Sequence, residues 1–190
     1  CLIWGCIPTK ALLEHAHALK VVREAEDWGV MLPYGAPALN MGKVHERKDK
    51  VVTGLTKGIE FLFKKNKIDW IKGIARLAGK GKVEVVEGDK QTLEAKEIII
   101  ATGSSPRSVP GIQIDKKRII TSDEAIHLPE IPKSLVILGS GAVGVEFASI
   151  FCRFGSEVTI IELLPRLVPV EDEAISAELE KSFKKQGIKS

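Results

Sequence analysis

Two cysteines and a lysine in the first ten residues have the types and spacing for redox chemistry. The segment reads CLIWGCIPTK, so Cys1 and Cys6 enclose four residues and Lys10 follows one helical turn after Cys6. If a helix begins near Cys6 or Pro8, the free N–H groups and positive dipole at its start favour a thiolate over a thiol. Lys10 adds a positive charge on the same helix face. The spacing therefore predicts a pair that cycles between dithiol and disulfide.

A structural disulfide, two buried thiols or a metal site are the alternatives for these cysteines. A bridge around so short a loop contributes only about 2 kcal/mol through loop-closure entropy. Cys152 is the only other cysteine, so the chain has no disulfide framework. His15 and His17 lie two positions apart on an expected helix, on different faces, and do not complete a ligand set. We therefore favour the redox interpretation.

Residues 134–162 have the pattern of a nucleotide-binding unit. An apolar strand-like segment leads into GSGAVG at 139–144, a helical pattern ends at Gly155, and a second apolar segment ends at Glu162. In such units the first glycine permits a tight turn, the second lets the backbone approach a pyrophosphate, and the third lets helix and strand pack closely. The helix N-terminus holds the phosphates. The alternative, an ordinary strand–helix–strand unit with a glycine-rich turn, explains fewer of these matching parts.

Glu162 predicts which dinucleotide binds. A carboxylate at this position accepts hydrogen bonds from ribose hydroxyls and repels a 2′-phosphate. The next arginine is Arg166, which does not follow the carboxylate directly. We therefore expect NAD rather than NADP. The predicted NAD-binding residues are Gly139, Ser140, Gly141, Ala142, Val143, Gly144, Val145, Glu146 and Glu162.

The composition predicts a soluble α/β protein with a packed core, because 44% of the residues are hydrophobic and 28% are charged. A net charge of +3 is too small to indicate nucleic acid or a membrane surface as partner. No apolar run has transmembrane length, and no signal peptide precedes Cys1. A reactive cysteine pair without other bridges fits a reducing compartment. We therefore expect a cytoplasmic protein, or one of the mitochondrial matrix if the source is eukaryotic.

Hydrophobic periodicity and turn residues predict the remaining elements. Helices are expected over about 11–27 and 44–67, and the lysines of the second helix are expected to form a solvated face. Short strands are expected over 69–77, 82–86 and 91–93, and a buried strand over 97–100 that runs into a small-residue turn. Residues 34–40 are expected to form a loop, 104–111 a linker, and 119–129 a connecting segment.

These segments resemble the FAD-dependent pyridine nucleotide–disulfide oxidoreductases, in particular the dihydrolipoamide dehydrogenases among them. The most specific matches are CxxxxCIPTK at 1–10, IATGS at 100–104, TSDEA at 121–125 and GSGAVGVE at 139–146. The resemblance implies an α/β fold with two Rossmann-like dinucleotide-binding domains, both incomplete in this chain. A partial FAD-binding domain with the redox-active disulfide would occupy 1–122, and a partial NAD-binding domain 123–190. The chain would then be a fragment that lacks both termini.

The resemblance also implies a role for each site residue. Cys1 would be the interchange thiol, which attacks a substrate disulfide, and Cys6 would stack on the flavin as its charge-transfer partner. Lys10 would lie near flavin N5 and pair with Glu146 beside the nicotinamide. The implied catalytic residues are thus Cys1, Cys6, Lys10 and Glu146, and the implied FAD contacts are Lys10, Ala75, Thr102, Gly103 and Ser104.

The implied activity is the oxidation of dihydrolipoyl groups carried by 2-oxoacid dehydrogenase or glycine cleavage complexes. Electrons would pass through the Cys1–Cys6 disulfide and FAD to NAD, in a homodimeric parent enzyme. The alternatives are a glutathione-type or mercuric reductase, or a non-catalytic fragment. Glu162 disfavours the glutathione-type enzymes, which usually prefer NADP. The acid/base residue would lie outside this chain, so residues 1–190 alone are expected to bind FAD poorly and to be inactive.

Overall fold

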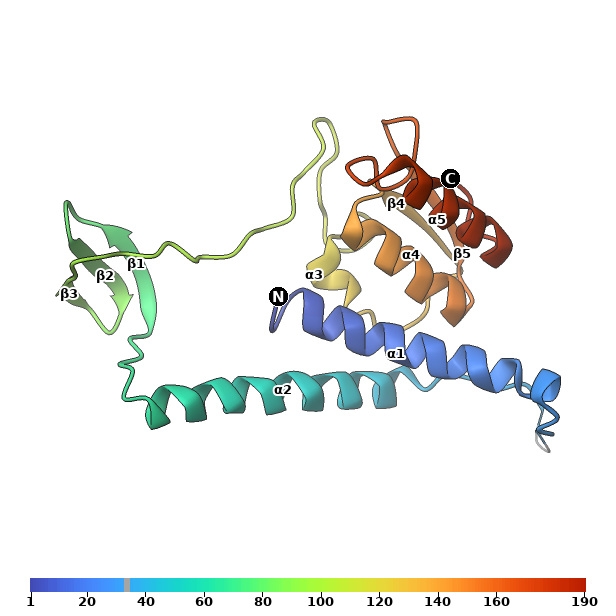
Figure 1. The fold of residues 1–190 in the computed structure, drawn as a ribbon, viewed down its shortest axis with the longest axis horizontal. Coiled ribbons are helices and arrows are strands. Elements are labelled where there is room, and N and C mark those ends of the chain that lie inside the picture. The colour runs from blue at the N-terminus through green and yellow to red at the C-terminus, as the bar shows by residue number, and fades with distance from the viewer. Residues whose placement is uncertain (33–34) are drawn as a thin grey trace. The chain divides into compact units, whose positions relative to one another are not determined.

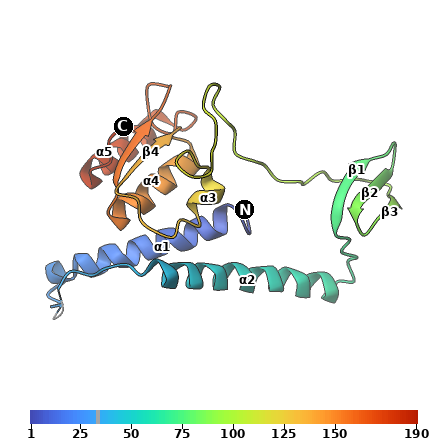
Figure 2. The ribbon, with the colours of Figure 1, turned by 180° about the vertical axis from the view of Figure 1, so that it is seen from behind.

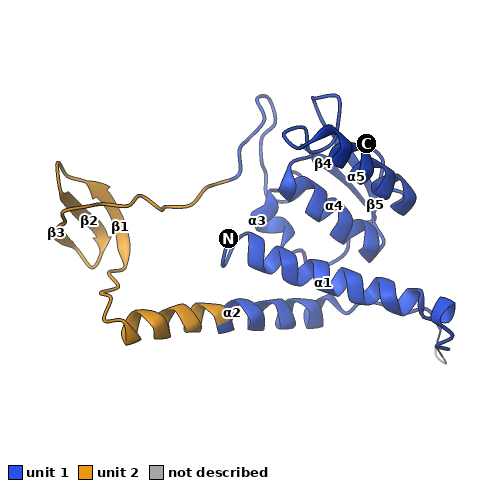
Figure 3. Cartoon of the chain, viewed as in Figure 1, with its two compact units in different colours: residues 1–54, 106–190 blue, residues 55–105 orange. Residues whose placement is uncertain are grey.

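The computed structural model describes residues 1–32 and 35–190. These residues divide into two compact units, one formed by 1–54 with 106–190 and the other by 55–105 (Figure 3). The predicted loop over 34–40 begins outside the described residues, and its part from 35 to 40 contains neither helix nor strand. This division into two units reflects where the residues pack densely against one another. The predicted boundary near residue 122 concerns an expected FAD-binding and an expected NAD-binding domain, and it stays a prediction.

The first unit begins with helix α1 (Cys6–Arg23) and a short 3-10 helix, η1 (Ala25–Trp28). Gly29 closes this segment with a left-handed backbone, φ 76°. The helix expected over about 11–27 is confirmed, although α1 already begins at Cys6 and the last part, from Ala25, is 3-10 helix. Pro8 lies in the first turn, where its missing N–H has no helical partner to lose. Helix α1 lies beside helix α4 (Ala142–Phe154), as Figures 1 and 2 show from opposite sides. Its buried residues include Leu12 and Ala16, which belong to the same core as the buried residues of α4.

The nucleotide-binding pattern folds as predicted. Strand β4 (Ser134–Leu138) leads through the glycine turn into α4, and strand β5 (Glu157–Ile161) pairs in parallel with β4 along its whole length. Gly155 ends α4 in the left-handed region, φ 117°, where a side chain would be strained. Helix α5 (Glu173–Gln186) follows. The arrangement is an incomplete Rossmann-like unit of parallel strands and helices.

Apolar side chains of α1, α4, β5 and α5 form one core in this unit. At its centre Phe151 stacks on Phe147 at 6.2 Å between ring centroids and meets Phe154 edge-on at 6.1 Å. Ile160 of β5 and Phe183 of α5 close the core, at 2% and 5% exposure. Burial of a side chain of this size contributes about 1.5–3 kcal/mol. This core therefore holds α1, the redox helix that begins at Cys6, and β4, α4 and β5, the nucleotide unit, in one body.

Lys48 is a buried charge that joins two helices of the first unit. It lies on helix α2 (Met41–Lys65), and its side chain is 1% exposed. Its Nζ donates to the Ile126 carbonyl at 2.8 Å and lies 3.0 Å from His127 Nδ1 and 3.3 Å from Asp49 Oδ1. These partners compensate the desolvation of the ammonium group. The prediction that the lysines of this helix form a solvated face is therefore wrong for Lys48.

The hydrogen bond from Lys48 to Ile126 fixes the end of the short helix α3 (Ser122–Ala125). This helix begins with a capping box between Thr121 and Glu124. His127 follows α3, and partial desolvation and the neighbouring Lys48 charge lower its pKa. Its ring also meets Trp4 edge-on at 5.8 Å between centroids. The loop between the two cysteines is thereby in contact with the segment that enters the nucleotide unit.

The second unit contains an antiparallel sheet in the order β1 (Gly73–Leu77), β2 (Lys82–Gly88) and β3 (Gln91–Glu94). The three predicted short strands are confirmed. Gly73 faces Gly88 across the sheet, and a side chain at Gly73 would overlap the Glu87 carbonyl oxygen. Glycine is therefore required where β1 begins, before the bulge at Ile74 and Ala75.

The predicted buried strand over 97–100 is wrong. The described segment 97–105 contains neither helix nor strand, and Ile99 and Ile100 are 90% and 69% exposed. A strand needs a neighbour for its backbone N–H and C=O groups, and none of the described residues supplies one here. Residues 104–111 form the predicted linker, again without helix or strand. No helix within the described ranges is long and apolar enough to cross a membrane.

Candidate redox and dinucleotide site

Cys1 and Cys6 form a disulfide at the start of α1, with their Cα atoms 4.5 Å apart. Cys6 is the first residue of the helix. The loop between them is held by hydrogen bonds: Ile7 N donates to the Cys1 carbonyl at 2.9 Å, and Thr9 Oγ donates to the Gly5 carbonyl at 2.7 Å. The predicted bond between these two sulfurs is thus formed at the positive end of the helix dipole, where a released Cys6 thiolate is stabilised.

Cys152, the third cysteine, is chemically different. It lies on α4, half-buried against the core, and its Sγ donates to the Gln186 carbonyl at 3.2 Å. Burial raises the pKa of its thiol, so the thiolate that attacks a disulfide is disfavoured. Cys152 therefore differs from the Cys1–Cys6 pair in its burial and its hydrogen bond, as well as in its distance along the sequence.

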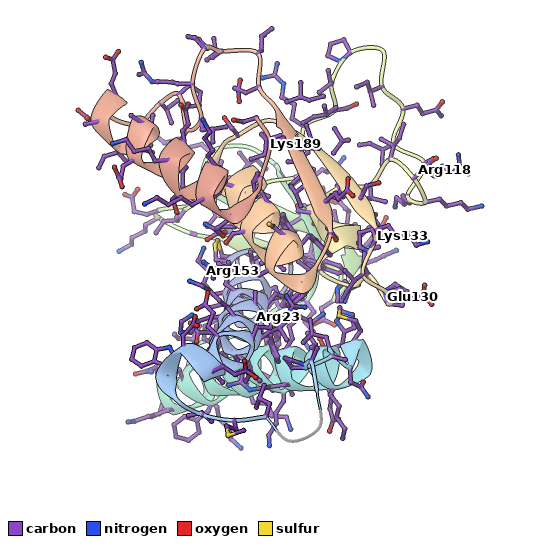
Figure 4. The ribbon with its side chains drawn as sticks, turned by 90° about the vertical axis from the view of Figure 1, so that its right-hand side faces the viewer. Arg23, Arg118, Glu130, Lys133, Arg153 and Lys189 are labelled. Atoms are coloured by element: carbon purple, nitrogen blue, oxygen red, sulfur yellow. A yellow bond between two sulfur atoms is a disulfide. The ribbon has the colours of Figure 1, made fainter. Side chains whose placement is uncertain are left out.

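An ion pair joins the redox helix to the nucleotide helix. Lys10 Nζ lies 2.7 Å from Glu146 Oε1, and the two side chains are 57% and 24% exposed. Both residues face each other because α1 and α4 pack along their lengths. At the other end of this helix pair, Arg23 Nη1 donates to the Arg153 carbonyl at 2.6 Å (Figure 4). The pairing of Lys10 with Glu146 is as expected, and their contacts with a flavin and a nicotinamide stay predictions.

Each glycine of the turn has a different physical role. Gly139 has φ 96°, and its N–H donates to the Ile161 carbonyl at 2.8 Å, which joins the turn to β5. A side chain at Gly144 would overlap the Gly139 carbonyl oxygen, so this glycine is needed for packing. At Gly141 no described heavy atom lies within 4 Å of an added Cβ. That open space is what a closely approaching pyrophosphate needs.

The N-terminus of α4 is suited to an anion. Gly141 is its N-cap, and no described side chain caps the helix there. The first N–H groups of a helix have no partner within the helix, and the dipole makes this end positive. A dinucleotide pyrophosphate satisfies both features. The described turn residues 139–145 therefore fit the predicted phosphate site.

Glu162 lies directly after β5, beside the glycine turn. Its Oε1 accepts from Leu164 N at 3.0 Å, and its Oε2 accepts from Ser140 N at 2.8 Å and Ser140 Oγ at 2.7 Å. The bond from Leu164 and the two from Ser140 lower the pKa of Glu162 to about 2. The carboxylate is therefore an oriented anion at neutral pH. The sequence predicted that Glu162 follows the second strand, as it does, but did not reveal the bond from the Ser140 hydroxyl.

The predicted FAD contacts other than Lys10 lie in the second unit. Ala75 is on strand β1, and Thr102, Gly103 and Ser104 belong to the segment 97–105. All four are exposed, and Gly103 has a left-handed backbone, φ 81°. Lys10 belongs to the first unit, and the contact of all five residues with FAD stays a prediction. Among the described residues, no cluster of three or more His, Cys, Asp or Glu side chains is arranged to hold a metal ion.

Comparison with known proteins agrees with this geometry. The profile of the pyridine nucleotide-disulphide oxidoreductases matches residues 1–190. Dihydrolipoyl dehydrogenase 3 of Pseudomonas putida is 47% identical over 99% of this chain and 41% of its own length. Dihydrolipoyl dehydrogenase of Zymomonas mobilis is 44% identical over 100% of this chain and 41% of its own length.

A solved structure of a flavoprotein disulfide reductase is also similar to this chain. The HOCl-induced flavoprotein disulfide reductase of Escherichia coli superposes with a TM-score of 0.78 at 30% identity, over 100% of this chain and 39% of that one. The chain thus spans about 41% of the length of the curated relatives it matches. With the disulfide at the start of α1 and the dinucleotide-type turn before α4, the chain belongs to the pyridine nucleotide–disulfide oxidoreductase family.

Proposed function

We propose that the protein containing this chain is an FAD-dependent, NAD-linked dihydrolipoyl dehydrogenase. The observation that carries the proposal is the ion pair between Lys10 and Glu146, 2.7 Å long. It joins the helix that bears the redox disulfide to the helix whose N-terminus fits a dinucleotide. Two-electron transfer from a dithiol to a nicotinamide needs these two sites within one folded body.

The disulfide is the acceptor for the substrate's electrons. A dihydrolipoyl thiolate attacks Cys1 Sγ, the Cys1–Cys6 bond breaks, and Cys6 leaves as a thiolate. The second substrate thiol, after losing its proton, attacks the substrate sulfur of the mixed disulfide and releases Cys1 as a thiolate. The substrate is thereby oxidised to its disulfide, the cysteine pair gains two electrons, and two protons are released or retained on the thiols. FAD, when bound, would accept these electrons and pass a hydride to NAD.

The residues around Cys6 favour it as the leaving thiolate. It occupies the first position of α1 and receives the positive end of the dipole. Lys10 lies one turn further on the same helix, and Glu146 holds its ammonium group. The pair orients the lysine toward the junction of α1 and α4. Its proposed role is to keep a fixed positive charge beside the reacting centre without leaving an unpaired charge in the oxidised protein.

The glycine turn and Glu162 are the proposed NAD site. Backbone N–H groups at the start of α4 would hold the pyrophosphate, and the Glu162 carboxylate would accept from ribose hydroxyls. The lowered pKa of Glu162, about 2, keeps this group negative at physiological pH. A 2′-phosphate would meet a like charge there, which supports NAD over NADP.

The proposed partners are dihydrolipoyl groups on 2-oxoacid dehydrogenase or glycine cleavage complexes. The support is that the Pseudomonas putida and Zymomonas mobilis relatives carry the name dihydrolipoyl dehydrogenase. A homodimeric parent and a location in the cytoplasm or mitochondrial matrix belong to the same proposal. A disulfide reductase with another substrate is the second candidate, because the similar Escherichia coli structure is such a reductase.

The full-length protein tests the proposal through NAD-linked oxidation of dihydrolipoamide. We expect turnover with the wild type and none with Cys6→Ser, because no disulfide can then accept electrons. Cys152→Ser is the matched control, since this thiol lies outside the redox pair, and it should retain turnover. Reduction of glutathione disulfide or mercuric ion with NADPH, without activity on dihydrolipoamide, would contradict the proposal and favour the second candidate.

A further inference from the structure

Ser140, the second residue of the glycine turn, is fully buried, at 0% exposure. Its hydroxyl donates to Glu162 Oε2 at 2.7 Å and accepts from Val168 N at 3.2 Å. A serine hydroxyl has a single hydrogen to donate, and here it is directed at the carboxylate. Its backbone N–H reaches the same oxygen at 2.8 Å. The residue therefore binds Glu162 twice, and only the hydroxyl bond depends on the side chain being serine.

The segment after Glu162 folds back to hold Ser140 in place. Val168 has φ 42°, a left-handed backbone that is unusual for a β-branched residue. Its N–H reaches both the carbonyl and the hydroxyl of Ser140, each at 3.2 Å. Its carbonyl accepts from the hydroxyl of Ser176 at 3.3 Å, and Ser176 is 0% exposed on α5. The left-handed turn at Val168 is thus held by bonds from its N–H to Ser140 and by a bond from Ser176 to its carbonyl.

The hydroxyl bond limits how the Glu162 carboxylate can turn. Leu164 N holds one carboxylate oxygen at 3.0 Å, and the two donors of Ser140 hold the other. A carboxylate with one donor fewer can rotate away from a nearby phosphate and reduce the repulsion. A carboxylate held by three donors keeps its charge in place, which is how a binding site rejects an unwanted anion.

We infer that Ser140 is a positioning residue whose hydroxyl fixes the orientation of the Glu162 carboxylate and thereby sets the discrimination between NAD and NADP. The inference rests on the proposed function in one respect, because it requires a dinucleotide to bind at the glycine turn. It adds a residue that acts through Glu162 and a support, from Val168 and Ser176, that lies outside the GSGAVG motif.

A double-mutant cycle on the full-length protein tests this inference. The measured quantity is the ratio of kcat/KM with NAD to kcat/KM with NADP, in the wild type, Ser140→Ala, Glu162→Gln and the double variant. Loss of one hydrogen bond to a charged group predicts a fall of the ratio by about 10-fold in Ser140→Ala. The fall should come from a lower KM for NADP, because the Glu162 carboxylate can then turn away from the 2′-phosphate, and it should appear in this KM more than in kcat. In the Glu162→Gln background, Ser140→Ala should change the ratio by less than about 2-fold.

Ser149→Ala is the matched control. Ser149 is another buried serine on α4, 9% exposed, and it takes no part in the bonds to Glu162. Its substitution should leave the ratio unchanged. Ser140→Gly serves as the second variant if Ser140→Ala does not fold, because it removes the hydroxyl and keeps the backbone N–H donor.

Two outcomes would overturn the inference. One is an unchanged ratio in both Ser140 variants, with only the melting temperature lowered. The other is an equal fall of the ratio with and without Glu162, since the hydroxyl would then act independently of the carboxylate. Direct titration of NAD and NADP binding to the same variants, followed by fluorescence, separates this inference from the proposed function. A protein that discriminates the dinucleotides but does not oxidise dihydrolipoamide contradicts only the proposed function.

Discussion

Two apolar segments of this chain, 134–138 and 97–100, each run into a turn of small residues. The first is strand β4, paired in parallel with β5, and its turn continues into α4. The second contains no strand, and Ile99 within it is 90% exposed. Both have the strand-like composition, but only the first has a pairing strand and a covering helix within the next few tens of residues. The comparison teaches that apolar composition marks a candidate strand, whereas a pairing partner makes one.

The two turns differ in the same way. Gly139, at the start of the first turn, donates its N–H to Ile161 of the neighbouring strand at 2.8 Å, and Gly144 packs against the Gly139 carbonyl. At Gly103, in the second turn, no described heavy atom lies within 4 Å of an added Cβ. In the first turn, glycine is therefore required at Gly144 because a side chain there would clash with neighbouring atoms. In the second turn, glycine is favoured at Gly103 only because its backbone is left-handed.

The largest expected difference concerns two isoleucines. Ile160 is 2% exposed and Ile99 is 90% exposed. In residues 1–190, Ile160→Ala should lower the free energy of unfolding by about 2–5 kcal/mol through lost burial and a cavity. Ile99→Ala should change it by less than about 0.5 kcal/mol. Urea denaturation followed by circular dichroism measures both values.

The same pair of substitutions in the full-length protein sharpens the comparison. If Ile99→Ala there costs as much as Ile160→Ala, a strand from outside residues 1–190 covers the segment 97–100. Equal costs within residues 1–190 would contradict the structure of this segment.

The next largest effect separates the glycines. Gly144→Ala should destabilise the protein by about 1–3 kcal/mol, because its Cβ would overlap the Gly139 carbonyl and the turn must shift. Gly103→Ala should cost about 1 kcal/mol or less, since only the left-handed backbone is strained there. Thermal melting of the two variants gives the order. A larger loss for Gly103→Ala would mean that the second turn is packed after all.

Gly141→Ala is the functional control for this pair. Gly141 has ordinary backbone angles, φ −67°, and open space around an added Cβ. Its substitution should therefore leave the melting temperature unchanged. It should weaken NAD binding to the full-length protein, because a methyl group would occupy the space proposed for the pyrophosphate.

A smaller effect is expected from pH. Glu162 has a pKa of about 2 in the folded chain and an ordinary value of 4.5. A lowered folded-state pKa gives stability that is present above about pH 4.5 and is lost as the pH falls toward 2. The carboxylate is partly exposed, so solvent screening limits this contribution to about 1 kcal/mol. Because Asp115 and Glu124 also have lowered pKa values, the measurement is the difference in unfolding free energy between wild type and Glu162→Gln from pH 2 to 6. A difference that does not change over this range would contradict the three-donor site.

The features that sequence reasoning predicted are those whose partners lie nearby in the chain. The start of α1 at Cys6 depends on its own first turn, and β4, the glycine turn, α4 and β5 complete one another within residues 134–162. The position of the Glu162 carboxylate after the second strand could be predicted for the same reason. The pairing of Lys10 with Glu146 came from resemblance, because spacing alone cannot show that α1 packs on α4.

The features that sequence reasoning missed depend on distant residues. The burial of Lys48 requires the Ile126 carbonyl, 78 positions away, and in its own helix Lys48 is one lysine among several. The hydroxyl bond of Ser140 to Glu162 requires the supporting turn at Val168, 28 positions away. The segment 97–100 was assigned a strand because its composition is right, although its hydrogen-bond partners are absent from the described residues. Each of these errors concerns the presence or absence of a tertiary contact, which the local sequence pattern does not reveal.

The smallest expected change in stability is at the ion pair between Lys10 of α1 and Glu146 of α4. Lys10 and Glu146 are 57% and 24% exposed, so their attraction is screened and side-chain entropy offsets part of it. Lys10→Met should lower the unfolding free energy by about 0.5 kcal/mol or less. Lys43→Met is the matched control, because Lys43 makes an exposed pair with Glu46 at 3.3 Å, and its effect on stability should be equally small.

Activity should separate these two lysines although stability does not. In the full-length protein, Lys10→Met removes the positive charge one turn after Cys6, so the Cys6 thiolate that leaves during reduction by dihydrolipoamide is less stabilised. Stopped-flow reduction should therefore be slower in Lys10→Met and unchanged in Lys43→Met. If both substitutions slow reduction equally, the rate depends on the total positive charge of the protein. The position of Lys10 between α1 and α4 would then have no specific role in the reaction. If Lys10→Met loses several kcal/mol of stability with an unchanged reduction rate, the pair is a structural tie, and the functional link between the disulfide and the nucleotide turn must lie elsewhere.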